Sequence, residues 1–399
     1  MKTVNEAIDY LIAQAQVTQQ IESRSLPQAL GCVLAQPVIS PVNVPPHDNS
    51  MMDGYAVRTA EIQPGLVMPI SQRIPAGTQP APLAPSSVAR IFTGAPIPAG
   101  ADAIIMQEEA ELRDSGVCFN QPIRAGQNIR CCGEDIAQHH EILSAGHKLR
   151  PQDLALIASV GQAAVEVYKP LTLVTLTTGD ELLQPGQAPE PGKIYNSNHT
   201  NLMSLVSQLG FDWVDMGQVE DTLEATQAAL SKAAQLGDVI ITTGGVSVGE
   251  EDHLKPAVEC LGKLDMWQVK MKPGKPLAFG EVMGKPFIGL PGNPVSAFTT
   301  FNLFARPFLL AMQGASCLTP ESIWLTADFD WLNPGFRLEF VRARIENREQ
   351  TSFARIYPHQ GSGVLTSTVW ATGLVVIPED TPIKKGDAVE YISFNALSH

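Results

Sequence analysis

Residues 241–253 read ITTGGVSVGEEDH and join the end of an apolar segment to a loop rich in glycine and carboxylates. The apolar run that ends at Ile241 is typical of a buried β-strand. The glycines that follow allow the backbone to approach a ligand closely, as in loops whose N–H groups bind phosphate. A lysine usually follows in such loops, whereas here Glu250, Glu251 and Asp252 follow. The stretch therefore predicts a ligand-binding loop that has carboxylates at the place where a lysine is usual.

Apolar strands alternate with amphipathic helices on both sides of this loop, from about residue 171 to 313. Such alternation is typical of a parallel sheet with helices on both faces, and ligands bind beyond the carboxyl ends of its strands. We therefore expect three polar loops, TTGDE, TTGGVSVGEED and LPGNP, at one edge of the sheet. The predicted elements lie in LTLVTLTTGDEL (171–182), TNLMSLVSQLGF (200–211), DWVDMGQV (212–219), TLEATQAALSKAAQL (222–236), DVIITTGG (238–245) and PFIGLPGNPVSAFTTFNLF (286–304).

The rest of the chain divides by composition. Residues 4–30 have helical spacing, and residues 151–161 return to it and are expected to rejoin the first helix. Between them prolines and glycines recur every few residues, which predicts an inserted β-rich domain. After Pro320 apolar residues alternate by twos, which predicts a small antiparallel barrel or sandwich. The predicted fold class is a multidomain α/β protein with a discontinuous helical subdomain (1–39 plus 140–170), an inserted β-rich domain (40–139), a parallel-sheet α/β module (171–317) and a C-terminal barrel or sandwich (318–399).

Composition narrows the classes of partner. The 399 residues are 44% hydrophobic and 17% charged, with a net charge of −14, which disfavours nucleic acid or an anionic membrane as the main partner. Glu6 and Asp9 interrupt the apolar N-terminal pattern, so an amphipathic helix is expected there rather than a signal peptide, and no apolar run predicts a membrane span. Six cysteines without a C-x-x-C pair, two of them adjacent (Cys131 and Cys132), favour a reducing cytoplasm.

Carboxylates follow several of the predicted strands. Acidic loop residues are usually solvated, and we interpret Glu250 and Glu251 in this way. Glu181 and Asp252 differ because the parallel topology brings their loops together. Two carboxylates about 5 Å apart repel by roughly 3 kcal/mol at an effective dielectric near 20, so a cluster of them needs a cation, a proton or lysines. Mg²⁺ prefers a few carboxylates together with substrate phosphate and water, and we therefore predict magnesium at Glu181 and Asp252.

Lysines come from a separate segment, VKMKPGKPLAFG (269–280). Its prolines stiffen Lys272 and Lys275, which lowers the entropy cost of binding an anion, although surface lysines are common.

In NSMMDGYAVR (49–58), Asp53 is typical of a turn residue that bonds nearby backbone N–H groups. LPGNPVSAF is compatible with a rigid strand-to-helix connection, and no Ser-His-Asp constellation is evident.

Read together, these stretches resemble the molybdopterin molybdenumtransferase family, which is known in bacteria as MoeA and in animals as the E domain of gephyrin. The matching segments occur in the family's order and cover nearly the whole chain. They are SMMDGYA (50–56), FTGAPIP (92–98), GEDI (133–136), TTGDEL (177–182), KIYNSN (193–198), TTGGVSVGEED (242–252), KPGKP (272–276), GLPGNPVS (289–296) and PHQGSG (358–363).

The resemblance implies a homodimer whose subunits have four subdomains, the last of them a C-terminal β-barrel (318–399). It implies an enzyme that cleaves adenylated molybdopterin, inserts molybdenum from molybdate, and releases AMP and molybdenum cofactor with Mg²⁺. It implies contact with the molybdopterin adenylyltransferase and with enzymes that receive the cofactor. The family's site lies between the α/β module of one subunit and the β-rich domain of the other. Catalytic positions match Asp53, Glu181, Asp221 and Asp252, of which Glu181 and Asp252 would bind the metal. Substrate-binding positions match Thr93, Asp135, Lys272, Lys275, Pro291, Pro294, Arg342 and Ser362.

One departure from the family and two alternatives remain. Many relatives carry a basic residue after an aromatic one upstream of KPGKP, whereas this chain has Trp267 and Gln268, and Lys270 is a candidate replacement. A molybdopterin adenylyltransferase would need only the α/β module and would leave two-thirds of the chain unexplained. A scaffold of the gephyrin type would need an additional domain or a long linker.

Overall fold

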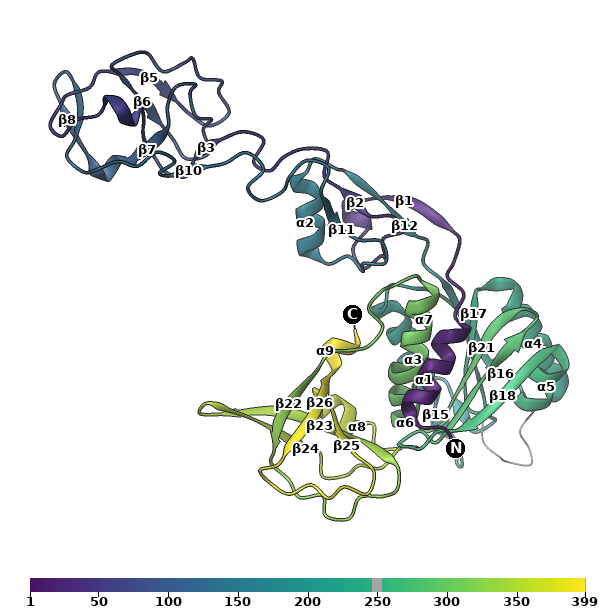
Figure 1. Cartoon of the computed structure of the whole chain (residues 1–399). Coiled ribbons are helices and arrows are strands. Elements are labelled where there is room, and N and C mark those ends of the chain that lie inside the picture. The colour runs from purple at the N-terminus through teal and green to yellow at the C-terminus, as the bar shows by residue number, and fades with distance from the viewer. Residues whose placement is uncertain (246–252, 399) are drawn as a thin grey trace. The chain divides into compact units, whose positions relative to one another are not determined.

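The computed structural model describes residues 1–245 and 253–398, and it forms two compact units. Unit 1 comprises Met1–Gln36, Ala145–Arg150 and Glu166–His399, and unit 2 comprises Pro37–Ser144 and Pro151–Val165 (Figure 1). The chain therefore passes from unit 1 into unit 2 and back. These units divide the chain differently from the four subdomains predicted from the sequence, whose bounds stay a prediction.

Unit 1 is built on a six-stranded sheet with the order β16-β13-β17-β21-β20-β18. The strands are β16 (Asp212–Val219), β13 (Thr172–Thr178), β17 (Val239–Thr243), β21 (Lys285–Leu290), β20 (Pro276–Val282) and β18 (Gly262–Gln268). The first four are parallel to one another, as predicted. The sheet also has antiparallel members, because β20 pairs antiparallel with both β21 and β18.

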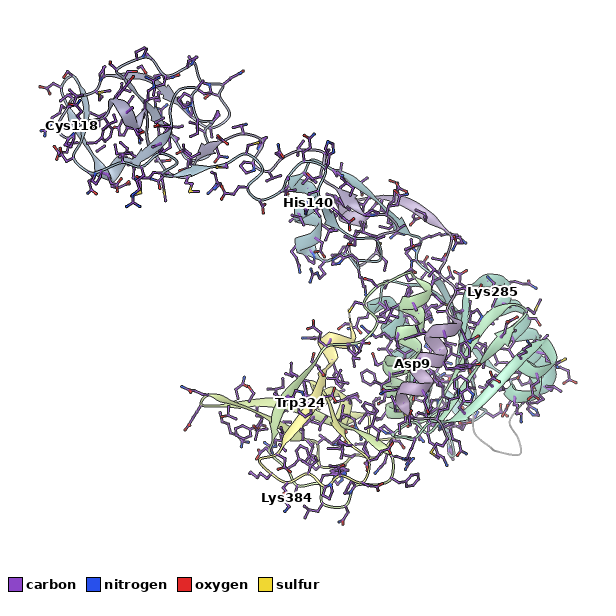
Figure 2. All side chains as sticks on the ribbon, viewed as in Figure 1. Asp9, Cys118, His140, Lys285, Trp324 and Lys384 are labelled. Carbon is purple, nitrogen blue, oxygen red and sulfur yellow. The ribbon has the colours of Figure 1, made fainter. Side chains whose placement is uncertain are left out.

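A tight turn explains the antiparallel strands. Only Met283 and Gly284 separate β20 from β21, and both have positive φ, 50° and 81°. A two-residue turn of this kind joins antiparallel neighbours, whereas parallel strands need a crossover connection. Consequently β20 begins at the edge where β17 and β21 end, and the segment before Pro276 lies beside the loops that follow the parallel strands. Lys285 marks the opposite end of β21 (Figure 2).

Helices cover both faces of this sheet because alternate strand residues point to opposite sides. Val239 and Ile241 pack with α1 (Val4–Gln14), α3 (Ser197–Gln208) and α7 (Arg306–Met312). Ile240 faces the other way and packs with α4 (Leu223–Leu236) and α5 (Leu254–Leu261). The helix α6 (Pro294–Thr300) continues through the π-helical turn η4 (Phe301–Ala305) into α7.

The stretch Pro294–Met312 is, among the described residues, the one helix long and apolar enough to pass a length-and-composition test for a membrane span. In the structure 89% of its apolar window is buried. Arg306 inside it is 2% exposed and donates hydrogen bonds to the carbonyl oxygens of Leu397 and Leu318. This helix is therefore the core helix of unit 1.

Two helical predictions need correction. The predicted helix over residues 4–30 ends at Gln14, and residues 21–25 form β1 (Ile21–Ser25), which pairs with β12 (Ala164–Tyr168). A capping box between Thr3 and Glu6 starts α1, but β-branched Val17, Thr18 and Ile21 favour extended backbone after it. The helix α2 (Pro151–Ser159) belongs to unit 2, where it packs on β11 (Glu141–Leu143) and does not continue α1.

The C-terminal strands close into the expected barrel. Their cyclic order is β23-β24-β22-β26-β25, and β25 pairs back to β23. They are β22 (Ser322–Ala327), β23 (Leu338–Arg348), β24 (Thr351–Ile356), β25 (Gly373–Ile377) and β26 (Ala388–Ser393). The short strand β19 (Met271–Lys272) adds to β23 in parallel, with Lys272 opposite Glu339. This pairing fastens the KPGKP segment to the barrel.

Unit 2 is β-rich, with small cores. A four-stranded sheet has the order β5-β6-β4-β7, from β5 (Ile70–Ile74), β6 (Val88–Ile91), β4 (Gly54–Val57) and β7 (Ala103–Met106). The remaining pairs are β8 (Ala110–Arg113) with β9 (Gly116–Phe119), β3 (Asn49–Ser50) with β10 (Ile129–Arg130), and β2 (Val38–Ile39) with β11. Apolar side chains fill both faces of the sheet: Val57 and Ile105 on one, Ala56 and Ile104 on the other.

Candidate functional site

A pocket of about 500 Å³ lies in unit 1 where the sheet meets the barrel. It combines the end of β17, the KPGKP segment, the loop before α6 and two barrel segments. We call it the anion pocket. Its described lining residues are Gly244, Gly245, Lys272, Pro273, Gly274, Lys275, Pro276, Pro291, Gly292, Asn293, Ser296, Arg337, Gln360, Gly361 and Ser362. These residues include Lys272, Lys275 and Arg337 and no carboxylate, in a chain with a net charge of −14.

Lys272 is held by a carboxylate behind the pocket wall. Its Nζ lies 3.0 Å from Oε2 of Glu339, whose side chain is 6% exposed while that of Lys272 is 46% exposed. Glu339 also accepts a hydrogen bond from the backbone N–H of Gly335. Burial of a lone carboxylate is costly, so the ion pair fixes the Lys272 side chain at the pocket edge.

Gly274 allows the KPGKP segment to turn between the two lysines. Its φ is +97°, and a Cβ at this position would lie 2.4 Å from Oγ1 of Thr300. The carbonyl oxygen of Lys275 accepts a hydrogen bond from the N–H of Val269. Lys272 and Lys275 therefore line the same pocket from the two sides of one tight turn.

The loop before α6 is fixed by residues of two predicted motifs. Asn198 of KIYNSN donates a hydrogen bond from Nδ2 to the carbonyl oxygen of Gly292, at 2.7 Å. The N–H of Val295 donates to the carbonyl oxygen of Ser362, at 3.0 Å. Pro291 lines the pocket, whereas Pro294 is the first residue of α6 and is not among the described lining residues.

Arg342 lies behind the pocket. Its side chain is 1% exposed and donates to Oγ of Ser367 at 3.1 Å and to the carbonyl oxygen of Gly361 at 3.2 Å. Burial lowers the pKa of Arg342 to about 10. Gln360 joins the same network because its Oε1 accepts from the Arg342 N–H. Arg342 thus holds the segment 360–362 that lines the pocket.

The acidic candidates of unit 1 are outside the described lining of the anion pocket. Glu181 is exposed in the loop after β13, and Asp221 directly precedes Thr222, the N-cap of α4. Asp252, Glu250 and Glu251 lie outside the described residues. Among residues 1–245 and 253–398 no group of three His, Cys, Asp or Glu side chains is arranged to hold a metal. The metal site at Glu181 and Asp252 therefore stays a prediction.

Asp53 and Thr93 come together in unit 2 although 40 positions separate them. Oδ1 of Asp53 accepts hydrogen bonds from both the N–H and Oγ1 of Thr93, each at 2.8 Å. The Thr93 N–H lowers the pKa of the Asp53 carboxyl group, and its hydroxyl adds to the effect. Asp53 therefore bonds a distant loop rather than its own turn. Asp135 is also in unit 2 and is exposed.

Lys270 is engaged elsewhere. Its ammonium group forms an ion pair with Glu379, and Lys270 is not among the described residues that line the anion pocket. This contact argues against Lys270 as the replacement for the basic residue that Gln268 lacks.

Arg337 and Gln360 were missed by the sequence reasoning. Gln360 belongs to the recognised PHQGSG segment, so the motif itself was an available signal. Arg337 stands outside every quoted motif, and its place in the pocket depends on the pairing of β19 with β23. That pairing joins segments far apart in sequence and leaves no local pattern.

Family models match most of the chain. The model described as "MoeA N-terminal region (domain I and II)" matches residues 2–161, "Probable molybdopterin binding domain" matches 174–311, and "MoeA C-terminal region (domain IV)" matches 325–394. The second match covers the α/β module, and the other two cover the regions on either side of it.

Curated relatives and a solved structure agree with these matches. The chain is 36% identical over 402 residues to the molybdopterin molybdenumtransferase of Haemophilus influenzae, with 100% of both chains covered. It is 36% identical to molybdopterin molybdenumtransferase 2 of Mycobacterium tuberculosis, covering 89% of this chain and 90% of that one. The molybdopterin biosynthesis protein moeA of Pyrococcus horikoshii OT3 is 28% identical, with a TM-score of 0.85 over 98% of this chain and 100% of its own. The chain therefore belongs to the molybdopterin molybdenumtransferase family.

Proposed function

We propose that this enzyme inserts molybdenum from molybdate into adenylated molybdopterin, releases AMP and forms molybdenum cofactor. The observation that carries the proposal is the anion pocket, in which Lys272, Lys275 and Arg337 stand without a lining carboxylate among the described residues. Molybdate and the phosphate linkage of an adenylated substrate are both anions. Cations in a partly enclosed pocket bind such groups more strongly than they would in open water.

The pocket residues have distinct tasks in this reaction. Lys272 and Lys275 bind the oxyanion and stabilise charge that develops as the phosphate linkage breaks. The backbone at Gly244, Gly245 and Gly292 lets the substrate approach closely, because no side chain stands in the way. Arg342 acts on the substrate through segment 360–362, which it holds in place. No covalent enzyme intermediate is needed, in agreement with the lack of a Ser-His-Asp constellation among the predicted motifs.

Mg²⁺ is proposed as the cofactor, with Glu181 and Asp252 as ligands. Glu181 is an exposed carboxylate, which is the ligand type that Mg²⁺ prefers, and its carboxylate has no partner among the described residues. The ion would offset the negative charge of the phosphate groups. Supplementing metal-free protein with Mg²⁺ should restore activity, and Glu181→Ala should raise the Mg²⁺ concentration required. Equal activity with and without a chelator would contradict the assignment.

A homodimer is proposed because the residues that match the family site are divided between the two units. Asp53, Thr93 and Asp135 belong to unit 2, whereas the anion pocket belongs to unit 1. Asp53 keeps one carboxylate oxygen free of Thr93, so it is able to contact a substrate.

A cytoplasmic location is proposed from the six unpaired cysteines, of which four are exposed. The adenylyltransferase that supplies the substrate and the enzymes that receive the cofactor are the proposed protein partners.

Incubation of the purified protein with adenylated molybdopterin and molybdate tests the function. We expect AMP release coupled to the formation of a product that activates a cofactor-free molybdoenzyme. If the protein instead forms adenylated molybdopterin from molybdopterin and ATP, it is an adenylyltransferase. A scaffold would turn over neither substrate.

A further inference from the structure

Arg337, the third cation of the anion pocket, has no neutralising partner within the part of the chain that the structure describes. Lys272 is paired with Glu339, whereas no carboxylate among the described residues forms an ion pair with Arg337. Arg337 is partly buried, in a chain that has 41 acidic residues against 27 basic ones. A guanidinium group that lines a cavity without a counter-ion is a suitable ligand for an anion.

The position of Arg337 is fixed by the barrel. One of its terminal nitrogens donates a hydrogen bond to the carbonyl oxygen of Met271, at 3.3 Å. The N–H of the next residue, Leu338, donates to the carbonyl oxygen of Lys270, at 3.1 Å. These two bonds place Arg337 beside the backbone of Lys272. A guanidinium has five N–H donors, so most of them remain available after the bond to Met271.

We propose that Arg337 binds a tetrahedral oxyanion in the anion pocket, together with Lys272 and Lys275. The oxyanion is either molybdate or a phosphate group of the adenylated substrate, since both present oxygens in the same geometry. The planar guanidinium forms two parallel hydrogen bonds to such a group, which the point charge of a lysine does not provide. This inference rests on the proposed function and assigns a role to a residue outside every recognised motif.

The test compares Arg337→Gln and Arg337→Lys with the wild-type protein. Arg355→Gln is the matched control, because it removes the same charge from the same barrel at an exposed position that contacts Glu346. Calorimetric titration with molybdate alone and with inorganic phosphate alone measures binding without turnover. The KM for molybdate and the KM for adenylated molybdopterin are measured separately. Thermal unfolding shows whether each variant is folded.

We expect Arg337→Gln to weaken oxyanion binding about ten- to hundredfold, which is typical for the loss of a hydrogen-bonded charge. Arg337→Lys should recover part of the affinity, and Arg355→Gln should bind as the wild type does. If Arg337→Gln raises only the KM for molybdate, molybdate is the anion that Arg337 binds. If it raises only the KM for adenylated molybdopterin, the anion is the substrate phosphate. If folded Arg337→Gln and Arg337→Lys both bind the two oxyanions as the control does, the proposal is wrong.

The proposed function can fail independently of this inference. Failure of the wild-type protein to form cofactor would overturn the function, whereas the calorimetric titrations would still show whether Arg337 binds an oxyanion.

Discussion

At the scale of single residues, the anion pocket depends on one buried carboxylate. Glu339 is 6% exposed at its side chain and meets Lys272 at 3.0 Å. The two residues are opposite each other in the β19–β23 pair, so the ion pair also joins the KPGKP segment to the barrel. Lys272 therefore has a structural task that Lys275, at the other side of the same turn, does not share.

Lys272→Ala should destabilise the protein as well as weaken anion binding, because it leaves Glu339 buried without its cation. Half of Lys272 is exposed, so we expect a loss of about 1–3 kcal/mol in the free energy of unfolding. Lys275→Ala is the control and should weaken binding with little change in stability. The double variant Lys272→Ala/Glu339→Gln should recover most of the lost stability, as measured by denaturant unfolding. If it recovers none, the unpaired Glu339 carboxylate is not the cause of the destabilisation.

At the scale of elements, most of what the sequence predicts is local pattern. The strand β16 coincides with the predicted DWVDMGQV segment, and α4 lies within its predicted segment, because apolar periodicity and caps are encoded in neighbouring residues. The helix α3 overlaps its predicted segment but begins before it, at Ser197. The end of α1 was mispredicted, and the antiparallel placement of β20 was not predicted. Both depend on tertiary pairing, of β1 with β12 and of β20 with β21 through a turn. The place of Arg337 in the anion pocket was not predicted either, because it depends on the pairing of β19 with β23.

Gly274→Ala should reduce both stability and turnover, because a Cβ would meet Oγ1 of Thr300 at 2.4 Å inside the KPGKP turn. Gly284→Ala is a matched control: its φ of +81° carries a similar backbone penalty, but no atom lies within 4 Å of the added Cβ. Left-handed backbone costs an alanine about 1–2 kcal/mol. Gly274→Ala should therefore lower the thermal unfolding temperature more than Gly284→Ala does. Of the two variants, only Gly274→Ala should bind oxyanions more weakly than the wild type.

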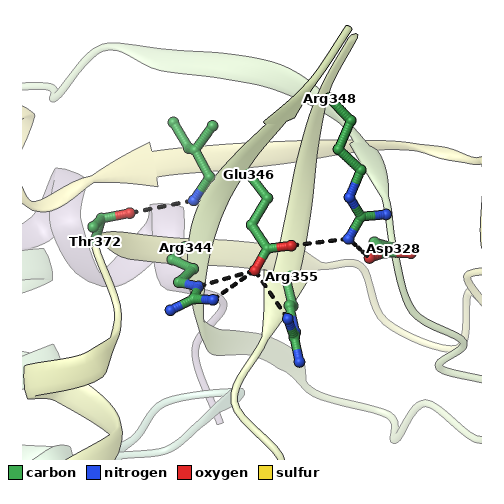
Figure 3. A network of polar contacts seen from close by, with 7 residues as sticks. Asp328, Arg344, Glu346, Arg348, Arg355 and Thr372 are labelled. Atoms are coloured by element: carbon green, nitrogen blue, oxygen red, sulfur yellow. Dashed lines mark hydrogen bonds and ion pairs between the residues drawn. The ribbon is translucent and has the colours of Figure 1, made fainter.

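The strands β23 and β24 carry an ion-pair network on the barrel surface (Figure 3). Glu346 accepts hydrogen bonds from Arg344, Arg348 and Arg355, and Arg348 also binds Asp328. The bond from Arg344 and then that from Arg348 lower the pKa of Glu346 to about 2 from its ordinary 4.5. A carboxyl group whose pKa falls on folding stabilises the folded state above its unfolded pKa. That contribution is lost as the pH falls from about 4.5 to 2.

Glu346→Gln should therefore lower the free energy of unfolding at pH 7, and its difference from the wild type should shrink as the pH falls through that window. The side chain of Glu346 is 19% exposed, and those of its partners Arg348 and Arg355 are 47% and 52% exposed, so salt should also reduce the difference. The control Glu321→Gln changes an exposed carboxyl group outside the network. A difference between wild type and Glu346→Gln that stays constant from pH 7 to pH 2 would show that the ion pairs do not stabilise the barrel.

At the scale of the whole molecule, the residues that match the family site fall into two different compact units. Lys272, Lys275 and Ser362 meet in the anion pocket of unit 1, and the sequence motifs identified all of them. Asp53 and Thr93 meet in unit 2. Pattern and resemblance were sufficient to name these residues, but motif order along one chain carries no information about which subunit completes which site.

Mixing two inactive variants tests whether the sites are shared between subunits. Asp53→Asn removes the charge but keeps an oxygen that accepts from Thr93, so its loop should stay folded. Lys275→Ala removes a cation from the anion pocket, and each variant alone should be inactive or nearly so. If a site combines Asp53 of one subunit with Lys275 of its partner, each hybrid dimer has one wild-type site and one with both defects. Random exchange makes half of the dimers hybrid, so about a quarter of the wild-type activity should return by the two-fold symmetry. If Asp53 instead serves the site of its own chain, every site in the mixture keeps one defect and activity does not return.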